Sequence, residues 1–163
     1  MASTRIVAHA ELYIGLVEFG VGLIPAWTGT KEMVRRVLGP VMETPNANVL
    51  PHLQKAFEQI ALAKVSESAM LARAMGFLGP ADRIVLNRDH HLAEAKRVAL
   101  DLAAGGYQPM KPQKVWAAGR DALAALKLAV WQMVDGGYAS EHDGKIADKL
   151  AYVLTGGDIS APG

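Results

Sequence analysis

Residues 13–33 read YIGLVEFGVGLIPAWTGTKEM, and the interpretation of the whole chain starts from this stretch. It places one carboxylate, Glu18, inside an apolar and glycine-rich run, where an ionised group is costly unless it is hydrogen-bonded or charge-paired. The run breaks at Pro25 and enters a Gly-Thr turn before a helical pattern begins at Thr30. We therefore expect Glu18 near the end of a strand, facing the N-terminus of a helix, as a candidate general acid or base.

Length and composition favour one domain with a buried core. The 163 residues are 51% hydrophobic and carry a net charge of +1, which excludes a disordered tail. The basic residues are dispersed, which gives no support to nucleic-acid binding. The absence of cysteine excludes disulfides, thiolate zinc sites and cysteine nucleophiles. Neither a long apolar run nor a signal-peptide pattern is found, so we expect a cytoplasmic protein with no nucleic-acid and no membrane partner.

Strand signals are few and lie mainly at the start of the chain. Residues between Arg5 and Glu18 are rich in β-branched and aromatic side chains and predict one or two short strands. Residues 82–87 predict another strand. The expected class is α/β, mostly helical, with two or three short strands near the N-terminus and one near residue 84. So small a sheet is marginal, which means either that further strands come from elsewhere or that the N-terminal segment docks onto the helices.

Helical periodicity dominates the rest of the chain. We expect helices over 30–38, 53–61, 66–76, 89–104, 120–134 and one opened by a capping box at residues 140–143. Ser66 and Asn87 are expected to cap two of these helices, and Gly-Gly pairs are expected to end the last three. Residues 40–51 are expected to form a loop. Gln59 is expected on a solvent face, and the apolar face of 89–104 is expected to comprise Leu92, Ala95, Ala99 and Leu102.

The same residues carry a resemblance to a known family. Gly15 to Glu18 and Gly22 to Pro25 resemble the Gly-x-x-Glu and Gly-x-Ile-Pro of the crotonase (enoyl-CoA hydratase/isomerase) superfamily. Residues 69–78 continue the match. The sequences of residues 14–18, 29–33 and 149–154 are similar to the hydratase portion of bacterial multifunctional 3-hydroxyacyl-CoA dehydrogenases. The resemblance implies that 1–163 is a single domain, the later part of a crotonase-like fold, with strands and the Glu18 turn in 1–29, helices and one strand in 30–104, and C-terminal helices in 115–157.

The resemblance also implies the chemistry and the residues that perform it. A glutamate at the position of Glu18 transfers a proton at the α-carbon of an enoyl-CoA thioester in fatty acid β-oxidation. The thioester is the substrate, and neither a cofactor nor a metal is implied. The backbone N–H at the position of Ala26 helps hold the reacting water, and Gly29 is grouped with it as a substrate- or water-binding residue. Hydratases use a second, upstream glutamate, whereas isomerases can use the position of Glu18 alone, so both activities stay open.

Departures from the family pattern support a second hypothesis. The chain begins after the positions of the upstream glutamate and of both oxyanion-hole amides. Residues 26–28 replace small glycines, and Trp27 is expected to fill space that an acyl chain would need. The alternative to an enzyme fragment is therefore a non-catalytic, mainly helical module that associates with itself to cover exposed apolar surface. A homo-oligomer is the expected state.

Other polar groups have both a functional and an ordinary interpretation. His90-His91 suggests a metal site, but adjacent helix residues point about 100° apart, so a solvated helix start is favoured. His9 with Glu11 shares one strand face, yet two ligands make a poor site. Lys31 and Arg35-Arg36 could meet CoA phosphates near a helix N-terminus, against the ordinary interpretation of a solvated basic face.

Overall fold

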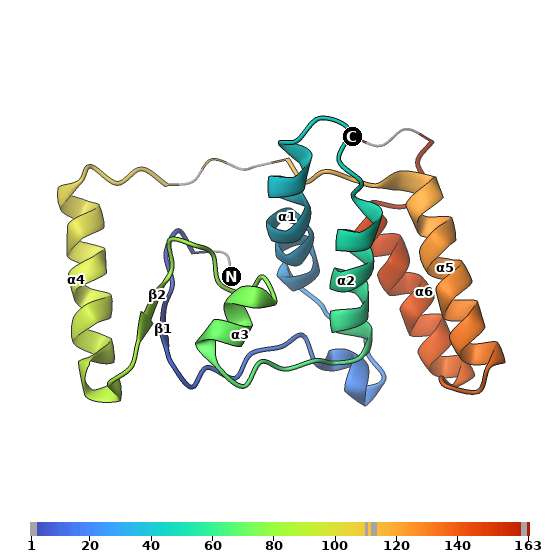
Figure 1. The fold of residues 1–163 in the computed structure, drawn as a ribbon, viewed down its shortest axis with the longest axis horizontal. Helices are drawn as coiled ribbons and strands as arrows, with labels where there is room; N and C mark the ends of the chain where they lie inside the picture. The colour runs from blue at the N-terminus through green and yellow to red at the C-terminus, as the bar shows by residue number, and fades with distance from the viewer. Residues whose placement is uncertain (1–2, 110, 112–113, 161–162) are drawn as a thin grey trace. The chain divides into compact units, whose positions relative to one another are not determined.

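The computed structural model describes residues 3–109, 111, 114–160 and 163. The chain divides into two compact units, one of residues 1–14 and 66–114 and the other of residues 15–65 and 115–163. Across the described residues helices predominate and the sheet has two strands, which confirms the expected mostly helical α/β class (Figure 1). The assignment of 1–163 to a single crotonase-like domain stays a prediction.

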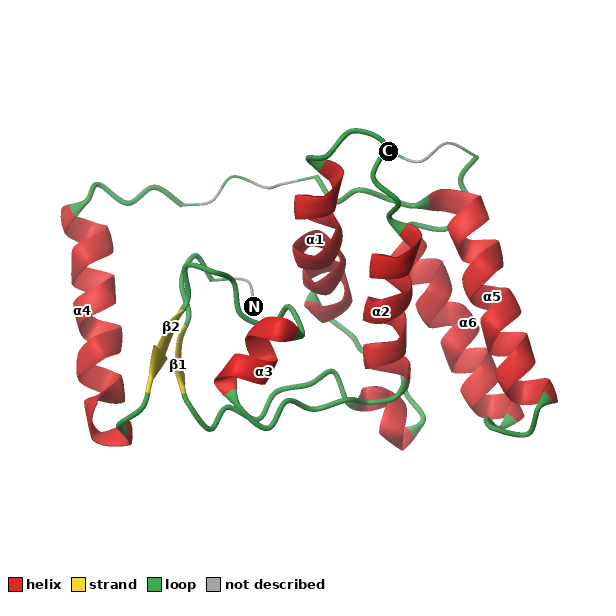
Figure 2. Cartoon of the chain, in the orientation of Figure 1, coloured by secondary structure: helices red, strands yellow, loops and turns green. Residues whose placement is uncertain are grey.

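The first unit is built on two parallel strands (Figure 2). Its elements are β1 (Val7–His9), α3 (Ala69–Ala74), β2 (Arg83–Val85), the 3-10 turn η2 (Arg88–His90) and α4 (His91–Ala104). Ala8 of β1 lies opposite Ile84 of β2. β2 lies within the predicted strand at 82–87, and between Arg5 and Glu18 the chain forms β1 and a single antiparallel bridge from Ile14 to Ser66. The sheet is therefore as small as the sequence indicated.

Ser66 is part of this bridge and does not cap a helix. Its side chain is fully buried; the hydroxyl donates to the Leu12 carbonyl at 3.0 Å and accepts the Ile14 N–H at 3.2 Å. Ser68 is the N-cap of α3, where its side chain accepts the Leu71 N–H at 3.1 Å. The prediction of a Ser66 cap is wrong because the Ser66 hydroxyl bonds to Leu12 and Ile14. These residues are too far away in the sequence for a local pattern to reveal the contact.

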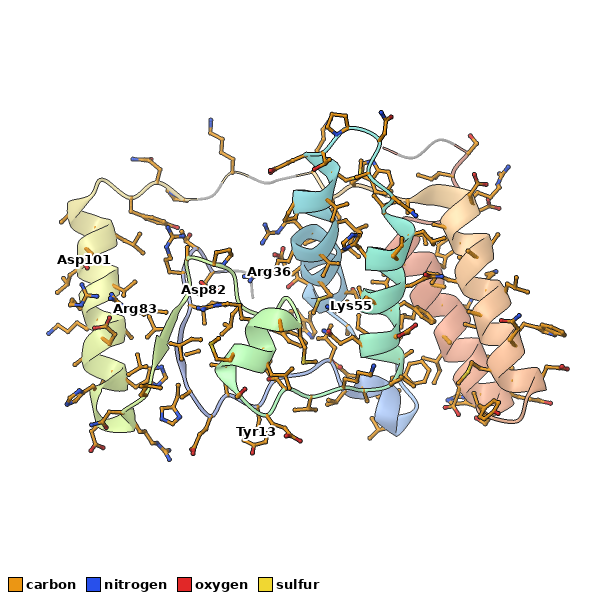
Figure 3. The ribbon with its side chains drawn as sticks, in the orientation of Figure 1. Tyr13, Arg36, Lys55, Asp82, Arg83 and Asp101 are labelled. Atoms are coloured by element: carbon orange, nitrogen blue, oxygen red, sulfur yellow. The ribbon has the colours of Figure 1, made fainter. Side chains whose placement is uncertain are left out.

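A buried carboxylate ties together the segments that lead into both strands. Asp82 Oδ1 accepts the Ile6 N–H at 2.8 Å, and Oδ2 accepts the Gly79 N–H at 2.7 Å. The Asp82 carbonyl accepts a bond of 2.7 Å from Nη2 of Arg73 on α3. Figure 3 shows Asp82 on the α3 side of β2. Because Ile6 and Asp82 directly precede the paired strands, these bonds help to set the strand register.

α4 packs on the sheet with a different face from the expected one. The half-buried positions on this side are His91, Ala95, Val98 and Leu102. Leu92 is 82% exposed and Ala99 is exposed, so the predicted face of Leu92, Ala95, Ala99 and Leu102 is wrong for two of its four members. Two polar contacts account for the rotation: His91 Nε2 lies 2.7 Å from the Val7 carbonyl, and Arg83, which is labelled in Figure 3, pairs with Glu94 at 2.8 Å.

The second unit is a helical bundle with no strand among its described residues. It contains the 3-10 turn η1 (Glu18–Val21), α1 (Gly29–Met42), α2 (Leu50–Ala61), α5 (Gly119–Asp135) and α6 (Glu141–Thr155). α5 and α6 form a hairpin, and α6 also contacts α1 and α2. All four helices contribute fully buried side chains to one core, which includes Met33, Leu38, Leu53, Ile60, Leu126, Leu150 and Leu154.

α1 continues past its expected end. The Gly39-Pro40 pair was expected to stop it, but the helix includes Pro40 and ends at Met42. Proline lacks the N–H that a helix interior needs, yet Pro40 lies in the last turn, where only its own backbone bond is lost. The expected loop of 40–51 therefore shortens to 43–49, and Pro51 lies in the first turn of α2, where proline is well tolerated.

α2 is covered over a wider arc than its apolar stripe indicates. The expected core positions Leu53, Ala56, Phe57 and Ile60 are buried. Gln59, expected to face solvent, is also buried, and its amide lies 3.8 Å from the Met33 sulfur. That prediction is wrong because both α1 and α6 pack against α2.

Several expected helix ends are confirmed. Asn87 accepts the Asp89 N–H at 2.9 Å at the start of η2, just before α4. Ser140 and Asp143 form the capping box of α6, and bonds from the Ser140 hydroxyl and backbone N–H hold the pKa of Asp143 below its ordinary value. α6 ends at Gly156 with φ 76°, where a Cβ would also overlap Ala117. Only glycine fits that position.

Replacing Asp82 is expected to destabilise the first unit strongly. Asp82→Ala leaves the Ile6 and Gly79 N–H groups without their acceptor, at a cost of about 2–4 kcal/mol. The measurement is urea unfolding of the full chain. Asp101→Ala is the matched control, because Asp101 forms only an exposed pair with Arg97 and its loss should cost less than about 1 kcal/mol. Equal losses for the two variants would contradict the role given to Asp82.

Candidate functional site

Glu18 opens a tight 3-10 turn. The expected strand end is wrong at this position, because η1 (Glu18–Val21) occupies it. The turn is closed by bonds from the Gly20 N–H to the Val17 carbonyl at 2.9 Å and from the Leu23 N–H to the Glu18 carbonyl at 3.1 Å. Gly22 ends the turn with φ 77°, a conformation that favours glycine. The glycine pattern of the opening stretch therefore builds a turn that presents Glu18.

The Glu18 side chain is half-buried and has no polar partner among the described residues. The sequence indicated that an ionised group here would need a hydrogen bond or a counter-charge. The Glu18 carboxylate is partly exposed, so water can supply the hydrogen bonds that the ionised group requires. The carboxylate is thus not committed to a structural contact within the described chain, and it is free to accept or donate a proton at a bound ligand.

Ala26 and Gly29 follow in the same unit. Ala26 is exposed, directly after the buried Pro25, and its N–H makes no backbone hydrogen bond within the described residues. Gly29 is the first residue of α1, and a Cβ there would lie 2.7 Å from Cδ2 of Leu16. Gly29 thus allows the start of α1 to approach the segment that leads into Glu18. The binding roles of Ala26 and Gly29 stay predictions.

Trp27 does not fill internal space. Its side chain is 97% exposed, and its backbone φ is 61°, in the left-handed region that a residue with a side chain rarely adopts. The expectation that its ring takes the place of an acyl chain is corrected on this point. Trp27 instead introduces backbone strain between Ala26 and α1, where the resembled family carries small glycines.

A contact missed in the sequence attaches the Glu18 turn to α6. His142 lies in the first turn of α6, as expected, and its Nε2 is 3.1 Å from the Gly22 carbonyl. A Cβ on Gly22 would lie 3.3 Å from the same nitrogen. Gly22 and His142 are 120 residues apart in the sequence. No local signal could have paired them.

The basic residues after the turn are occupied by an acidic neighbour. Glu32 is buried and pairs with Arg35 at 2.7 Å and with Lys31 at 3.4 Å. Burial opposes ionisation of Glu32, but these cations outweigh it, so the pKa of Glu32 lies below its ordinary value. Lys31 and Arg35 are therefore engaged within α1, which weakens the interpretation that they meet phosphates.

Two histidines of the first unit, His9 and His91, make backbone contacts. His9 Nε2 lies 3.2 Å from the Leu86 carbonyl, while its Nδ1 accepts the Glu11 N–H at 3.3 Å. The His9 and His91 rings are 6.3 Å apart. The part of the chain that the structure describes holds no group of three or more metal-ligating side chains. It also holds no helix long and apolar enough to cross a membrane.

Comparisons with known proteins identify relatives but no family model and no significantly matching solved structure. The chain is 46% identical over 159 residues to a protein of Bacillus subtilis (strain 168) named a probable 3-hydroxyacyl-CoA dehydrogenase. The alignment covers 98% of this chain and 20% of that protein. A 37-residue part, 23% of this chain, is 60% identical to proteins of Rickettsia prowazekii and Rickettsia felis named as fatty acid oxidation complex trifunctional enzymes.

The chain thus spans about a fifth of the Bacillus subtilis relative and matches 5% of each rickettsial one. The names of the relatives agree with the expected similarity to 3-hydroxyacyl-CoA dehydrogenases and to proteins of fatty acid oxidation. The crotonase resemblance and the role of Glu18 stay predictions.

Replacing Trp27 by glycine is expected to stabilise the second unit. Trp27→Gly removes left-handed strain of about 1–2 kcal/mol and loses part of that gain to the greater freedom of the unfolded chain. Trp27→Ala is the matched control, since it removes the ring but keeps the Cβ that causes the strain. Thermal unfolding of both variants tests this. A gain in Trp27→Ala equal to that in Trp27→Gly would show that the exposed ring, and not the backbone, was responsible.

Proposed function

We propose that this chain is the later part of an enoyl-CoA hydratase or isomerase of the crotonase type, acting on fatty acyl-CoA thioesters in β-oxidation. The observation that carries the proposal is the 46% identity, over almost the whole chain, to a protein named a probable 3-hydroxyacyl-CoA dehydrogenase. The crotonase-like motif at Gly15–Glu18 and Gly22–Pro25 supports it. We place the protein in the cytoplasm, with an acyl-CoA as substrate and with neither a nucleic acid nor a membrane as partner.

Glu18 is the proposed acid–base group. Removal of a proton from the α-carbon of an acyl thioester leaves an enolate, and the carboxylate takes up that proton. In hydration the oxygen of water bonds to the β-carbon, the protonated carboxyl of Glu18 delivers a proton to the α-carbon, and the resulting Glu18 carboxylate accepts the proton that the water loses. A half-buried carboxylate without a structural partner suits both directions. No cofactor takes part in either step.

Ala26 and Gly29 have supporting roles in this proposal. The exposed Ala26 N–H, which makes no backbone hydrogen bond within the described residues, is a suitable donor to the reacting water. Gly29 keeps α1 close to the segment before Glu18. An enolate also needs preorganised donors at its oxygen. We propose that these come from the remainder of a longer polypeptide or from a partner chain, since this chain spans 20% of its Bacillus subtilis relative.

Exchange of the α-protons of butyryl-CoA with deuterated water isolates the step given to Glu18. Because the enolate donors are assigned to another segment, the 163-residue chain is expected to accelerate this exchange only modestly, as followed by NMR, and Glu18→Gln is expected to reduce the rate to that of butyryl-CoA without protein. Glu67→Gln is the matched control, because Glu67 is an exposed glutamate outside the second unit. An unchanged rate in Glu18→Gln would remove the residue from the mechanism, and failure of butyryl-CoA to bind in calorimetry would overturn the proposal for this chain.

A second candidate function, self-association without catalysis, is favoured by the surface of the first unit. No residue of α4 is buried, and Leu92 and Leu100 are 82% and 59% exposed. Leu86, next to β2, is 82% exposed. Exposed apolar side chains such as these are typical of an interaction surface when they lie together. A homo-oligomer that covers α4 would bury them.

Leu92→Glu is expected to shift the chain toward monomer. A glutamate at this position introduces a charge that an apolar interface cannot bury without a large cost. Sedimentation velocity over a range of concentrations measures the shift, with Lys55→Glu on the exposed face of α2 as the control for added negative charge. A wild-type chain that is monomeric at every concentration would exclude this candidate.

A further inference from the structure

A groove lies within the second unit between α2 and α5. Its volume is about 470 Å³, within the range of small-molecule sites. α6 packs against both flanking helices (Figure 1). Its buried Gly144 and Ala147 form the floor of the groove. Phe19 of η1 also lines the groove. Small residues on the floor leave open the space between the two flanking helices.

The lining of the groove has the chemistry of an aliphatic site. Its walls include Phe19, Phe57, Leu126, Val130 and Met133. The polar groups that line it are amides, the Tyr138 hydroxyl and two carboxylates, those of Glu58 and Asp143. The Asp143 carboxylate is already engaged by Ser140. No basic side chain lines the groove, so the part of a ligand that enters it is uncharged, and an anionic group is repelled.

We propose that this groove binds the aliphatic chain of an acyl ligand, which enters by its methyl end while its polar head stays outside. The choice of an acyl ligand rests on the function proposed above, whereas the affinity for an aliphatic chain rests on the lining alone. Phe19, which lines the groove, directly follows Glu18 in the turn η1, so the groove and the candidate acid–base residue share one element. The groove then selects acyl chains by length, because each buried CH₂ adds about 0.8 kcal/mol of favourable transfer free energy.

Ala129 offers a way to fill the groove with little disturbance of the core. It lies on α5, lines the groove and is half-buried. Ala129→Phe therefore places a ring in the space of the ligand. Ala124→Phe is the matched control, since Ala124 lies on the same helix, is exposed and does not line the groove. Ala61→Phe fills the groove from α2 and serves as the second variant, with thermal unfolding to verify that each protein is folded.

The test uses the neutral fluorescent dye N-phenylnaphthylamine and its displacement by dodecanol. The full chain is expected to bind the dye and to release it on addition of dodecanol. Ala129→Phe and Ala61→Phe are expected to weaken both ligands about tenfold or more, and Ala124→Phe to leave them unchanged. Equal affinity in the wild type and in both groove variants overturns the proposal. A second result also overturns the proposal: the wild type is a dimer that Ala129→Phe dissociates, and dodecanol fails to displace the dye. In that case a second copy of the protein occupies the groove.

Further arms separate this proposal from the role of Glu18. Glu18→Gln is expected to leave dye and dodecanol binding intact. Dodecanoyl-CoA is expected to bind more tightly than butyryl-CoA in calorimetry, and Ala129→Phe to remove that difference while butyryl-CoA affinity stays the same. Binding of dodecanol without binding of either CoA ester supports the groove and contradicts the acyl-CoA function. Equal affinity for the two esters contradicts the groove.

Discussion

The position of Glu18 depends on the burial of four helices against one another. Helices of this length are marginal in isolation, so α1, α2, α5 and α6 owe their stability to the shared core around Leu53, Leu126 and Leu150. η1 has no buried residue of its own. It contacts α2, and the Gly22 carbonyl lies within hydrogen-bond distance of His142 on α6. The last helix of the chain therefore helps to hold the Glu18 turn in place, which gives the candidate site a long-range origin.

The sequence predicts local features well where the deciding interactions are local. Asn87, the Ser140–Asp143 box and the glycine at 156 act within a few residues of themselves, and all three have their expected roles. Errors occur where a distant segment decides. Ser66 bonds to Leu12 and Ile14, more than fifty residues away in sequence, and this contact replaces the expected cap. The rotation of α4 and the burial of Gln59 have the same cause, since each follows from which elements pack on that helix.

The candidate site also combines features that the sequence predicts with features that depend on distant segments. Glu18 could be selected from its glycine-rich surroundings, and the turn at Gly22 follows from a conformation that favours glycine. The partner of that turn could not be selected, because His142 carries no motif and lies in a different part of the chain. The groove could not be seen either: its lining comes from η1, α2, α5 and α6, and in the sequence Gly144 and Ala147 are only small residues on an amphipathic helix. For Trp27 the sequence predicted a ring that fills the space of an acyl chain, and this prediction is wrong. The ring is exposed, and the backbone at Trp27 is in the left-handed region.

In the proposed function the Glu18 carboxylate and the aliphatic groove have different tasks, and the free energies of proton transfer and of acyl-chain binding have separate origins. Binding of the aliphatic chain of the ligand depends on the apolar area that is removed from water. The walls of the groove supply that area without any other segment of the protein. Proton removal depends on stabilisation of the enolate, where each preorganised donor contributes about 2.7–4 kcal/mol to the transition state. Ala26 contributes one N–H, which the proposal assigns to water and not to the enolate oxygen. Donors supplied by a longer polypeptide would therefore raise the rate of proton transfer at Glu18 by orders of magnitude while leaving the preference for chain length unchanged.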